Sequence, residues 1–526
     1  VSAAGPPADL AAKINPALLE GEGAVQVALS TTRLFEVQDA LDYLLSYPYG
    51  CAEQTTSATM PWLALGGYHT LFPAHLSADK ARAAIQNGVD RLLQMVTDRG
   101  GLAYWPGGSE PSLWASAYGG FVLLRARSAG ALVPEETVND LVEYLVKSLR
   151  GLEKEADFYR VTDAALALYT LARAGHPQES YQNLLHARRD QLPETARLYT
   201  ALAMCLCNSP AAQIKDMLAA SAVKKGAKPL PAWSYWAGSG VNPALRLIVC
   251  THLGLKKDAE DLALSILNSR NGRGEWGNTF TNAWTLHALT AYERSLKPSA
   301  EPLLARVQWG AREAEINVPP HPGSAQVSLP LDARLTAAPM RLTLPEQRQG
   351  FTRVEARAFP PARDFQGENK GYAITRSYAK LLDRGELGGA DDLRVGDMVV
   401  VTLWIEIGQG AHRYLAIDDA LPGVLEAINP NFDTQNQRQG AQLPPGIQAW
   451  HCDHREIRAD RALFFTNYAP RGGKFQLRYL ARVIAEGDTT APPARIEAMY
   501  EPHRYGLSPA QRLKTLPSSG GQVAGR

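Results

Sequence analysis

Between about Leu34 and Leu296, apolar and small residues recur at helical spacing in segments that look alike. Each segment is rich in Ala and Leu, and three of them end in glycine, which often caps a helix C-terminus. The segments are Ala117–Gly130, Ala164–Gly175, Ala196–Cys207, Asn242–Gly254 and Asn282–Glu293. Because they start 32 to 47 residues apart, about one helical hairpin each, they predict stacked helix pairs. The spacing leaves open whether the pairs form an open solenoid or a closed α/α toroid.

Alternating apolar and polar residues flank this helical region and predict strands. Gly23–Ser30 alternates with period two, and after about Arg306 short alternating segments follow one another between Pro and Gly turns. These segments are Ala314–Val318, Ser324–Leu329, Arg341–Leu344, Arg353–Phe359, Gly371–Lys380, Asp397–Ile407, Tyr414–Ile417, Arg461–Asn467 and Lys474–Val483. Residues 506–526 carry Pro, Ser and Gly with few apolar residues, so we expect a loose tail there.

Loops that combine aromatic residues with glycine separate the helical segments. They are Gly100–Gly108, Trp233–Trp236 and Gly274–Gly277. In a toroid such loops would line one rim. They are either well-packed turns or part of a binding surface.

Composition narrows the class of protein. A chain of 526 residues predicts two to four domains at about 150 residues each. A net charge of +1 removes the electrostatic argument for a nucleic-acid binder, and no apolar run reaches the roughly 18 residues of a membrane span. The chain begins Val1-Ser2 without a leader, so we expect a processed or excised piece.

The five cysteines are too few for a disulfide scaffold, and their odd number leaves at least one without a cysteine partner. Cys205 and Cys207 lie in an apolar helical run, which favours small buried side chains. A bridge to Cys250 stays open.

One tetrapeptide, Cys51-Ala-Glu-Gln54, carries a specific chemistry. Pro48 and Gly50 interrupt the chain just before it, so we expect a helix to begin here. Residues i and i+3 share a helix face, which lets the Cys51 thiol reach the Gln54 carboxamide. Attack by the thiolate with loss of ammonia would give an internal thioester, an acyl group activated toward amines and hydroxyls. Glu53, in the same first turn, is either part of the motif or a solvated acid.

This segment resembles the thioester motif of the alpha-2-macroglobulin and complement family, whose defining element is Cys-x-Glu-Gln. The flanks Tyr47–Gly50 and Thr55–Ser57 resemble bacterial alpha-2-macroglobulins in particular. The resemblance continues through the Gly100–Gly108 loop and through three further stretches: Ser112–Tyr118, Gly277–Trp284 and Gly371–Tyr378. It therefore covers nearly the whole chain.

The resemblance implies a multidomain α + β fold. An α/α toroid (34–306) would be inserted into a CUB-like β-sandwich made of residues 1–33 and 307–365. A C-terminal macroglobulin-like β-sandwich (366–505) would follow, and the loose tail would end the chain.

The resemblance also implies a function. Bacterial members are broad-spectrum protease inhibitors in the periplasm, often lipid-anchored to the inner membrane. A protease cuts an upstream bait region, and the thioester then acylates a lysine of that protease. The partners would thus be target proteases, with no cofactor, no metal and no nucleic acid. The bait and upstream macroglobulin domains would be missing from this chain.

By the same resemblance, Tyr47, Met499 and Tyr500 would shield the thioester from water. Tyr47 can also be read as turn packing, and the other two as sandwich core. Some complement-type relatives carry a histidine that directs the acyl group to hydroxyls. The corresponding segment Asp157–Asp163 has no histidine, which favours amines.

Two rival functions remain for the same residues. Cys51 could be the nucleophile of a cysteine hydrolase with a base such as His287, which would not need Gln54. Alternatively, Cys51–Gln54 is inert and the chain is a non-covalent interaction module. The run His451-Cys-Asp-His454 borders a predicted strand, where its two histidines would diverge, so we expect no metal site.

Overall fold

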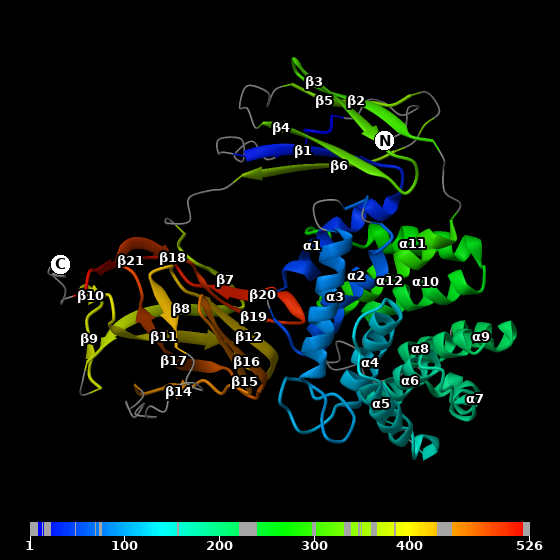
Figure 1. Cartoon of the computed structure of the whole chain (residues 1–526), viewed down its shortest axis with the longest axis horizontal. Helices are drawn as coiled ribbons and strands as arrows, with labels where there is room; N and C mark the ends of the chain where they lie inside the picture. The colour runs from blue at the N-terminus through cyan, green and yellow to red at the C-terminus, as the bar shows by residue number, and fades with distance from the viewer. Residues whose placement is uncertain are drawn as a thin grey trace, which may run out of the picture. The chain divides into compact units, whose positions relative to one another are not determined.

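The computed structural model describes residues 9–12, 14, 23–47, 49–68, 70–72, 76–154, 157–219, 239–296, 301–330, 338–345, 348, 350–358, 365–382, 385–428 and 444–518. The chain divides into two compact units, Val1–Phe359 and Pro360–Arg526. The first unit holds the helices and a small β domain, and the second is built of strands (Figure 1). Among the residues described, the helices lack the combination of length and apolarity that a bilayer crossing requires.

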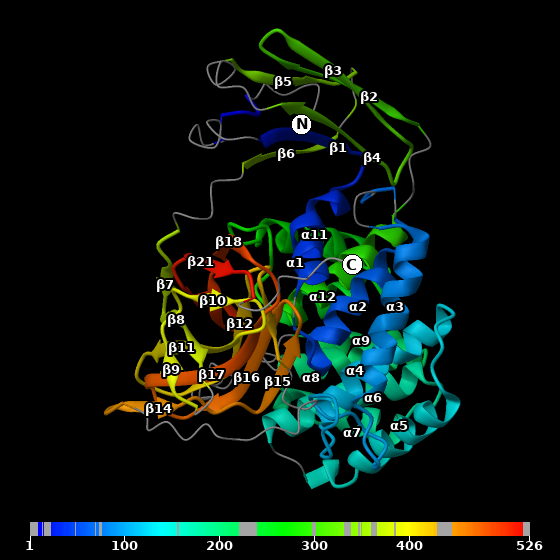
Figure 2. The same ribbon diagram turned by 60° about the vertical axis from the view of Figure 1, so that its left-hand side comes forward.

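The inner helices of the first unit form a closed ring. Each contacts the next, from α2 through α4, α6, α8 and α10 to α12, and α12 contacts α2 again. Figures 1 and 2 both show α12 beside α2. Closure excludes the open solenoid and gives an α/α toroid. The inner helices are α2 (Ala52–Leu65), α4 (Leu113–Ser128), α6 (Phe158–Arg173), α8 (Glu194–Leu206), α10 (Asn242–His252) and α12 (Thr279–Ser295).

Helices with one apolar face pack around this ring, as amphipathic helices at a surface do. They are α1 (Gln38–Ser46), α3 (Ala78–Leu93), α5 (Glu135–Ser148), α7 (Glu179–Ala187), α9 (Ala211–Leu218) and α11 (Lys256–Asn268). Short 3₁₀ segments join them at η2 (Arg33–Val37), η3 (Leu152–Lys154), η4 (Arg189–Gln191) and η5 (Ser239–Val241). The repeated segments found in the sequence are the inner helices from α4 onward. The glycines that end three of them have positive φ, as the C-cap interpretation predicts.

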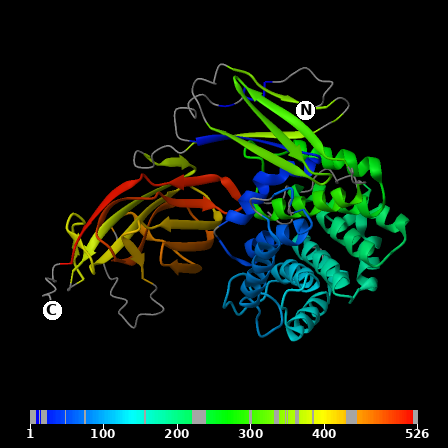
Figure 3. The same cartoon turned by 45° about the horizontal axis from the view of Figure 1, so that its top comes forward.

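The small β domain is interrupted in sequence by the whole toroid. β1 (Gly23–Ser30) lies before the helices, yet it pairs antiparallel with β4 (Ser324–Pro330) and β6 (Phe351–Ala358) after them. Figure 3 shows the blue strand β1 beside these green strands. A second sheet has the order β3-β2-β5, with β2 (Leu303–Trp309), β3 (Arg312–Val318) and β5 (Met340–Thr343). Apolar residues of both sheets form one core, so the toroid is an insertion in this domain.

The second unit is a β-sandwich. Its main sheets have the orders β13-β17-β11-β8-β9 and β15-β16-β12-β19-β20-β7, and a smaller sheet has the order β10-β21-β18. The predicted central strand is β11, which pairs on both sides. The strands are β7 (Glu368–Lys370), β8 (Tyr372–Leu381), β9 (Leu387–Gly388), β10 (Leu393–Arg394), β11 (Met398–Ile407), β12 (His412–Ala420), β13 (Leu425–Ala427), β14 (Ile447–Ala449), β15 (His454–Arg458), β16 (Arg461–Ala469), β17 (Gly473–Val483), β18 (Gly487–Ala491), β19 (Ala494–Ala498), β20 (Glu501–Leu507) and β21 (Gln511–Leu516).

The loose tail predicted for residues 506–526 is wrong over its described part, 506–518. β20 continues to Leu507, and β21 pairs antiparallel with β18 and parallel with β10. The cause is a short alternation in Gln511–Leu516 whose inward residues, Leu513 and Thr515, are buried. The surrounding Pro, Ser and Gly concealed this pattern. Residues 519–526 lie outside the described part of the chain.

Candidate functional site

Cys51 lies at the start of the inner helix α2. α1 ends at Ser46, and Cys51 is the N-cap of α2 with an extended backbone (φ −71°, ψ 173°). Gln54 is three residues later and completes a reciprocal capping box: its Oε1 accepts the Cys51 backbone N–H at 3.3 Å, and the Cys51 sulfur accepts the Gln54 backbone N–H. Both side chains therefore fold over the same first turn, where a helix has unpaired N–H donors.

Both reactive groups are removed from water. Cys51 is 0% and Gln54 1% exposed. Gln54 Nε2 is buried, and it has no hydrogen-bond partner among the described residues. Leaving a buried amide donor unsatisfied costs about 1–3 kcal/mol. The free carboxamide is thus an unfavourable occupant of this position.

The surroundings of Cys51 keep its sulfur protonated. Burial, and after it the neighbouring charge of Glu53, raise the pKa of the thiol to about 12. Hydrogen bonds from the Gln54 and Glu53 backbone N–H groups and from Tyr104 oppose this shift. A thiol held in this state is a poor nucleophile for an ordinary hydrolase at neutral pH.

The Gly100–Gly108 loop supplies Tyr104. The Tyr104 carbonyl accepts the Ala52 N–H at 2.9 Å, which satisfies a free donor at the start of α2, and the Tyr104 hydroxyl bonds the Cys51 sulfur. The loop is held by α4, since Ser116 Oγ accepts the Leu102 N–H at 2.8 Å. Gly100 has φ +80°, and a Cβ there would lie 2.6 Å from a carbonyl oxygen of α5. This loop is both a well-packed turn and a part of the site.

Glu53 is 0% exposed, so its interpretation as a solvated acid is wrong. Thr279 Oγ1, at the start of α12, donates to the two carboxylate oxygens at 2.9 and 2.8 Å. Ser57 Oγ donates to Glu53 Oε1 at 2.5 Å. Because Ser57 uses its only proton there, the Tyr118 hydroxyl of α4 donates to Ser57 Oγ, 3.0 Å away. Burial and the Glu53 charge raise the pKa of Tyr118 well above its usual range.

This buried network joins segments that lie far apart in the sequence. Ser112 caps α4 and Asn278 caps α12, each through its side-chain oxygen. The two helices then bring Tyr118 and Thr279 to Glu53. Below them an aromatic layer fills the ring, with Trp284 at 6.0 Å from Tyr118 between ring centroids. The first turn of α2 is therefore fixed from two sides.

The three residues predicted to shield the thioester are divided between the two units. Tyr47 lies four residues before Cys51 and packs edge-on against Tyr43 and Tyr49, with centroids 5.3 and 5.2 Å away. Met499 and Tyr500 lie in the second unit, at the turn between β19 and β20, and Tyr500 packs edge-on against Tyr414 at 5.2 Å. Shielding by all three residues stays a prediction.

His287 does not belong to this site. Its Nδ1 lies 3.1 Å from a guanidinium nitrogen of Arg125, near the C-terminal end of α4. Thr279, which does reach the site, is two turns earlier on α12, and eight residues of helix span about 12 Å. Burial and the neighbouring arginines lower the pKa of His287 well below its usual range. The base considered for a hydrolase thus lies about two helical turns from the Glu53 contact, in the middle of α12.

The structure also bears on the predictions for the cysteines and for the loops that combine aromatic residues with glycine. No disulfide joins any two of the five cysteines, so neither Cys205 nor Cys207 is bridged to Cys250. Glu275 and Trp276 of the Gly274–Gly277 loop precede the α12 cap, and the Trp276 N–H bonds Asn282 Oδ1. The loop Trp233–Trp236 lies outside the described residues. Tyr104, Ser57 and Thr279 were not singled out from sequence, although each lies in a motif segment.

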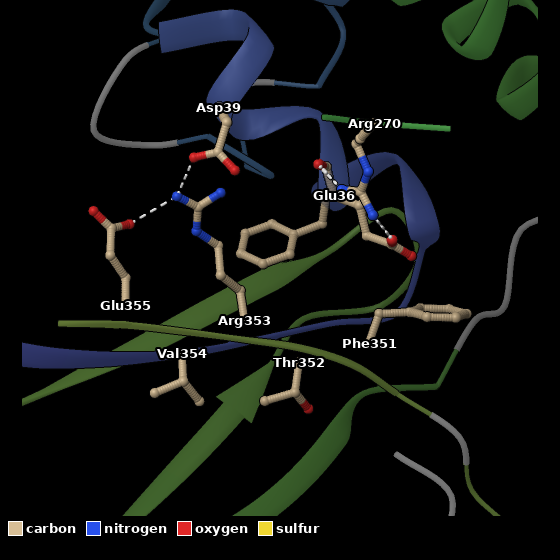
Figure 4. A pocket seen from close by; sticks show the side chains of 9 residues that line it. Glu36, Asp39, Arg270, Phe351, Thr352, Arg353, Val354 and Glu355 are labelled. Carbon is tan, nitrogen blue, oxygen red and sulfur yellow. Dashed lines mark hydrogen bonds and ion pairs between the residues drawn. The ribbon is translucent and has the colours of Figure 1, made fainter. Parts of the chain in front are cut away.

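A separate polar cavity of about 500 Å³ lies where α1 meets β6 (Figure 4). Arg353 reaches across it from β6 to Asp39 of α1 and also binds Glu355 at 2.8 Å. Arg270 binds Glu36 at 2.5 Å on the facing side. The Asp39–Arg353 pair ties the helix that leads to Cys51 to the small β domain, and the Glu36–Arg270 pair ties η2 to the segment that follows α11.

Two models of known protein families match parts of this chain. The family model described as the A-macroglobulin TED domain matches residues 24–152, and that of the Bacterial Alpha-2-macroglobulin MG10 domain matches residues 371–503. The first contains the Cys51 site, and the second covers most of the C-terminal sandwich. The fold is that of the C-terminal region of an alpha-2-macroglobulin, a helical TED domain followed by β-sandwich structure.

Individual relatives agree. The chain is 26% identical to an alpha-2-macroglobulin of Escherichia coli over 96% of its own length, and 25% identical to a homolog from Nostoc over 93%. It spans 30% and 27% of the length of these relatives. A crystal structure of native E. coli alpha-2-macroglobulin, from domain MG7 to the C-terminus, matches 96% of this chain and is itself covered to 80%, with a TM-score of 0.71 at 22% identity. The chain is thus similar to bacterial alpha-2-macroglobulins over nearly its whole length.

Proposed function

We propose that this chain carries the covalent capture site of a protease inhibitor, in which a thioester between Cys51 and Gln54 acylates an amine of the target protease. The observation that carries the proposal is the first turn of α2. There a buried thiol and a buried carboxamide share one capping box, and the amide nitrogen has no partner among the described residues.

Formation of the bond relieves that misfit. The Cys51 sulfur attacks the Gln54 carboxamide carbon, the C–N bond breaks, and ammonia leaves with the thiol proton. The unsatisfied amino group is thereby removed, and the acyl carbon stays in a dry pocket. Exclusion of water protects a thioester from hydrolysis. The thiol and the carboxamide are held together on one helical turn, and groups aligned in this way react with effective molarities that reach about 10⁵ M.

The stored acyl group then needs an amine. A lysine of a bound protease attacks the Gln54 carbonyl carbon, the C–S bond breaks, and an amide joins the two proteins. The segment Asp157–Asp163 carries no histidine, and amines need no imidazole intermediate, so we propose lysine rather than hydroxyl capture. The trigger by bait cleavage, the periplasmic location and a lipid anchor belong to the proposed full-length protein.

Methylamine tests the proposal directly. The purified chain should release one thiol on treatment with methylamine and gain one methylamine on Gln54. Gln54→Ala should show a free thiol from the start and incorporate no methylamine, while folding as the wild type does. Thr55→Ala, one residue further along α2, serves as the matched control and should behave as wild type.

The alternatives give other outcomes. A hydrolase would keep its activity in Gln54→Ala, and an inert segment would leave the thiol free in both proteins. A fresh wild-type protein whose Cys51 thiol is free and whose Gln54 never acquires methylamine contradicts the proposal.

A further inference from the structure

Tyr104 is attached to the start of α2 by two contacts of different kinds. Its carbonyl oxygen holds the Ala52 N–H at 2.9 Å, which fixes the loop backbone against the helix. Its hydroxyl hydrogen-bonds the sulfur of Cys51. Tyr104 is partly exposed, whereas Cys51 is fully buried. Tyr104 is therefore a partly exposed neighbour of a fully buried sulfur.

The sulfur faces a chemical difficulty when the thioester opens. The electron pair of the breaking C–S bond goes to a buried sulfur, beside the carboxylate of Glu53. Burial and that charge both disfavour the thiolate, as the raised pKa of Cys51 records. A leaving group that cannot hold its charge departs faster when an acid protonates it during the step.

We propose that Tyr104 is the acid that protonates the Cys51 sulfur as it leaves Gln54. The proposal rests on the thioester function proposed above and assigns a residue to its second step. As the amine nitrogen bonds to the Gln54 carbonyl carbon, the C–S bond breaks and the Tyr104 hydroxyl proton passes to Sγ. The phenolate that remains takes the proton that the former amine nitrogen loses once it is bonded to the carbonyl carbon. The products are an amide, a neutral thiol and a neutral tyrosine, so atoms and charge balance.

The other neighbours of the sulfur cannot fill this role. The backbone N–H groups of Glu53 and Gln54 donate hydrogen bonds to the sulfur but do not release their protons. Both carboxylate oxygens of Glu53 accept hydroxyl protons from Thr279, and one also accepts from Ser57. Among the described side chains that act on the sulfur, Tyr104 is the one that brings a transferable proton in a direct hydrogen bond.

The rate of thiol release by methylamine tests this assignment. Tyr104→Phe keeps the ring and the carbonyl contact and removes only the hydroxyl. We expect release to slow about 100-fold, the usual size of a general-acid contribution. Tyr144→Phe is the matched control, since Tyr144 packs on Gly101 of the same loop and its hydroxyl bonds serines away from Cys51. That variant should release thiol at the wild-type rate.

A fluorinated tyrosine at position 104 separates proton donation from packing. Fluorination lowers the pKa of a phenol without changing the fold, so the pH at which release slows should move down by the same amount. Glu53 is the other charged group acting on the sulfur, and it is unchanged in this protein. If Tyr104→Phe folds but forms no thioester, the protein with fluorinated tyrosine at position 104 decides the assignment instead. A slowing pH that does not move with the phenol overturns the assignment.

The two levels of failure are distinguishable. If wild type never releases a thiol with methylamine, the thioester function itself fails. If wild type releases it and Tyr104→Phe does so equally fast, only the role of Tyr104 fails.

Discussion

Two neighbouring residues, the buried Glu53 and the partly exposed Tyr104, act on the Cys51 sulfur in opposite directions. Glu53 disfavours the thiolate by its charge, and Tyr104 favours it by a hydrogen bond. A thioester is stable while its sulfur is a poor leaving group, and it reacts once that sulfur is assisted. The first turn of α2 therefore holds one residue that favours storage of the bond and one that favours its release.

Replacing Glu53 by glutamine should lower the pKa of the Cys51 thiol, because it removes a negative charge that raises this pKa. The measurement is the pH dependence of alkylation of the free thiol after methylamine treatment. The change should also lower the free energy of unfolding by about 1–3 kcal/mol, since an amide donor now faces hydroxyl donors. Glu293→Gln, a buried acid near the C-terminal end of α12, is the control. An unchanged thiol pKa in Glu53→Gln would refute the electrostatic role.

Tyr47→Ala should shorten the lifetime of the thioester in water. The substitution removes an aromatic ring that packs on Tyr43 and Tyr49 four residues before Cys51. We expect loss of the bond to become several-fold faster, followed as thiol appearance in buffer without amine. Tyr181→Ala, on the outer helix α7, controls for the loss of an aromatic side chain. Equal half-lives for wild type and Tyr47→Ala would remove Tyr47 from the shield.

At the scale of helices, the site depends on α2, α4 and α12 converging at their N-terminal ends. The caps at Cys51, Ser112 and Asn278 set the starts of these helices, and the Glu53 network then joins them. The helix α1 connects this site to the small β domain, because its Asp39 forms an ion pair with Arg353 of β6 (Figure 4). Only a few residues separate the end of α1 at Ser46 from Cys51, so a displacement of α1 would also displace Cys51.

The helix α6 carries a pH-dependent contribution to stability. Burial raises the pKa of Asp163 to about 7, with a smaller contribution from Asp157. The folded state therefore prefers the neutral acid, so its stability is greatest below the unfolded pKa of about 4 and declines as pH rises through 7. Asp163→Asn should gain about 2 kcal/mol at pH 8 and almost nothing at pH 4, after allowance for partial exposure.

Urea unfolding of the toroid at the two pH values measures this difference. Asp157→Asn keeps a good N-cap on the same helix and should show a much smaller gain with pH, because the Asp157 charge contributes less than burial to the raised pKa of Asp163. A gain for Asp163→Asn that is equal at both pH values would contradict the titration.

Five of the inner helices could be recognised from sequence because they are rich in Ala and Leu and three of them end in glycine. Closure of the ring could not, since contact between α12 and α2 joins residues more than 200 positions apart. Cys51 and Gln54 followed from their spacing alone. Tyr104 and Thr279 did not, because only the folded ring brings their loops to α2. Burial of Glu53 was likewise hidden, since the hydroxyls that satisfy it come from Ser57 and the distant Thr279. β21 was missed for a local reason, its short alternation among Pro and Gly.

At the scale of the whole molecule, the chain consists of two units with separate cores. The first holds the reactive residues and the second is the sandwich matched by the MG10 model. The family resemblance predicts that Met499 and Tyr500 of the sandwich help to keep the thioester dry. This prediction couples the two units through the lifetime of one bond.

Met499→Ala combined with Tyr500→Ala should therefore speed loss of the thioester in the intact chain, although neither residue is in the first unit. Thiol appearance in amine-free buffer is the measurement. Tyr468→Ala removes an exposed aromatic ring from β16 of the same sandwich and should leave the lifetime unchanged. If the double variant keeps the wild-type lifetime, the sandwich is not part of the shield.

The central claim is that the buried thiol of Cys51 and the carboxamide of Gln54 are joined in the native protein. Intact mass spectrometry of the freshly purified chain tests it most directly. We predict a mass one ammonia lighter than the sequence requires, which methylamine converts to a mass heavier by one methylamine, with the appearance of one thiol. A fresh protein with the full mass of the unmodified sequence, unaltered by methylamine, would contradict the account.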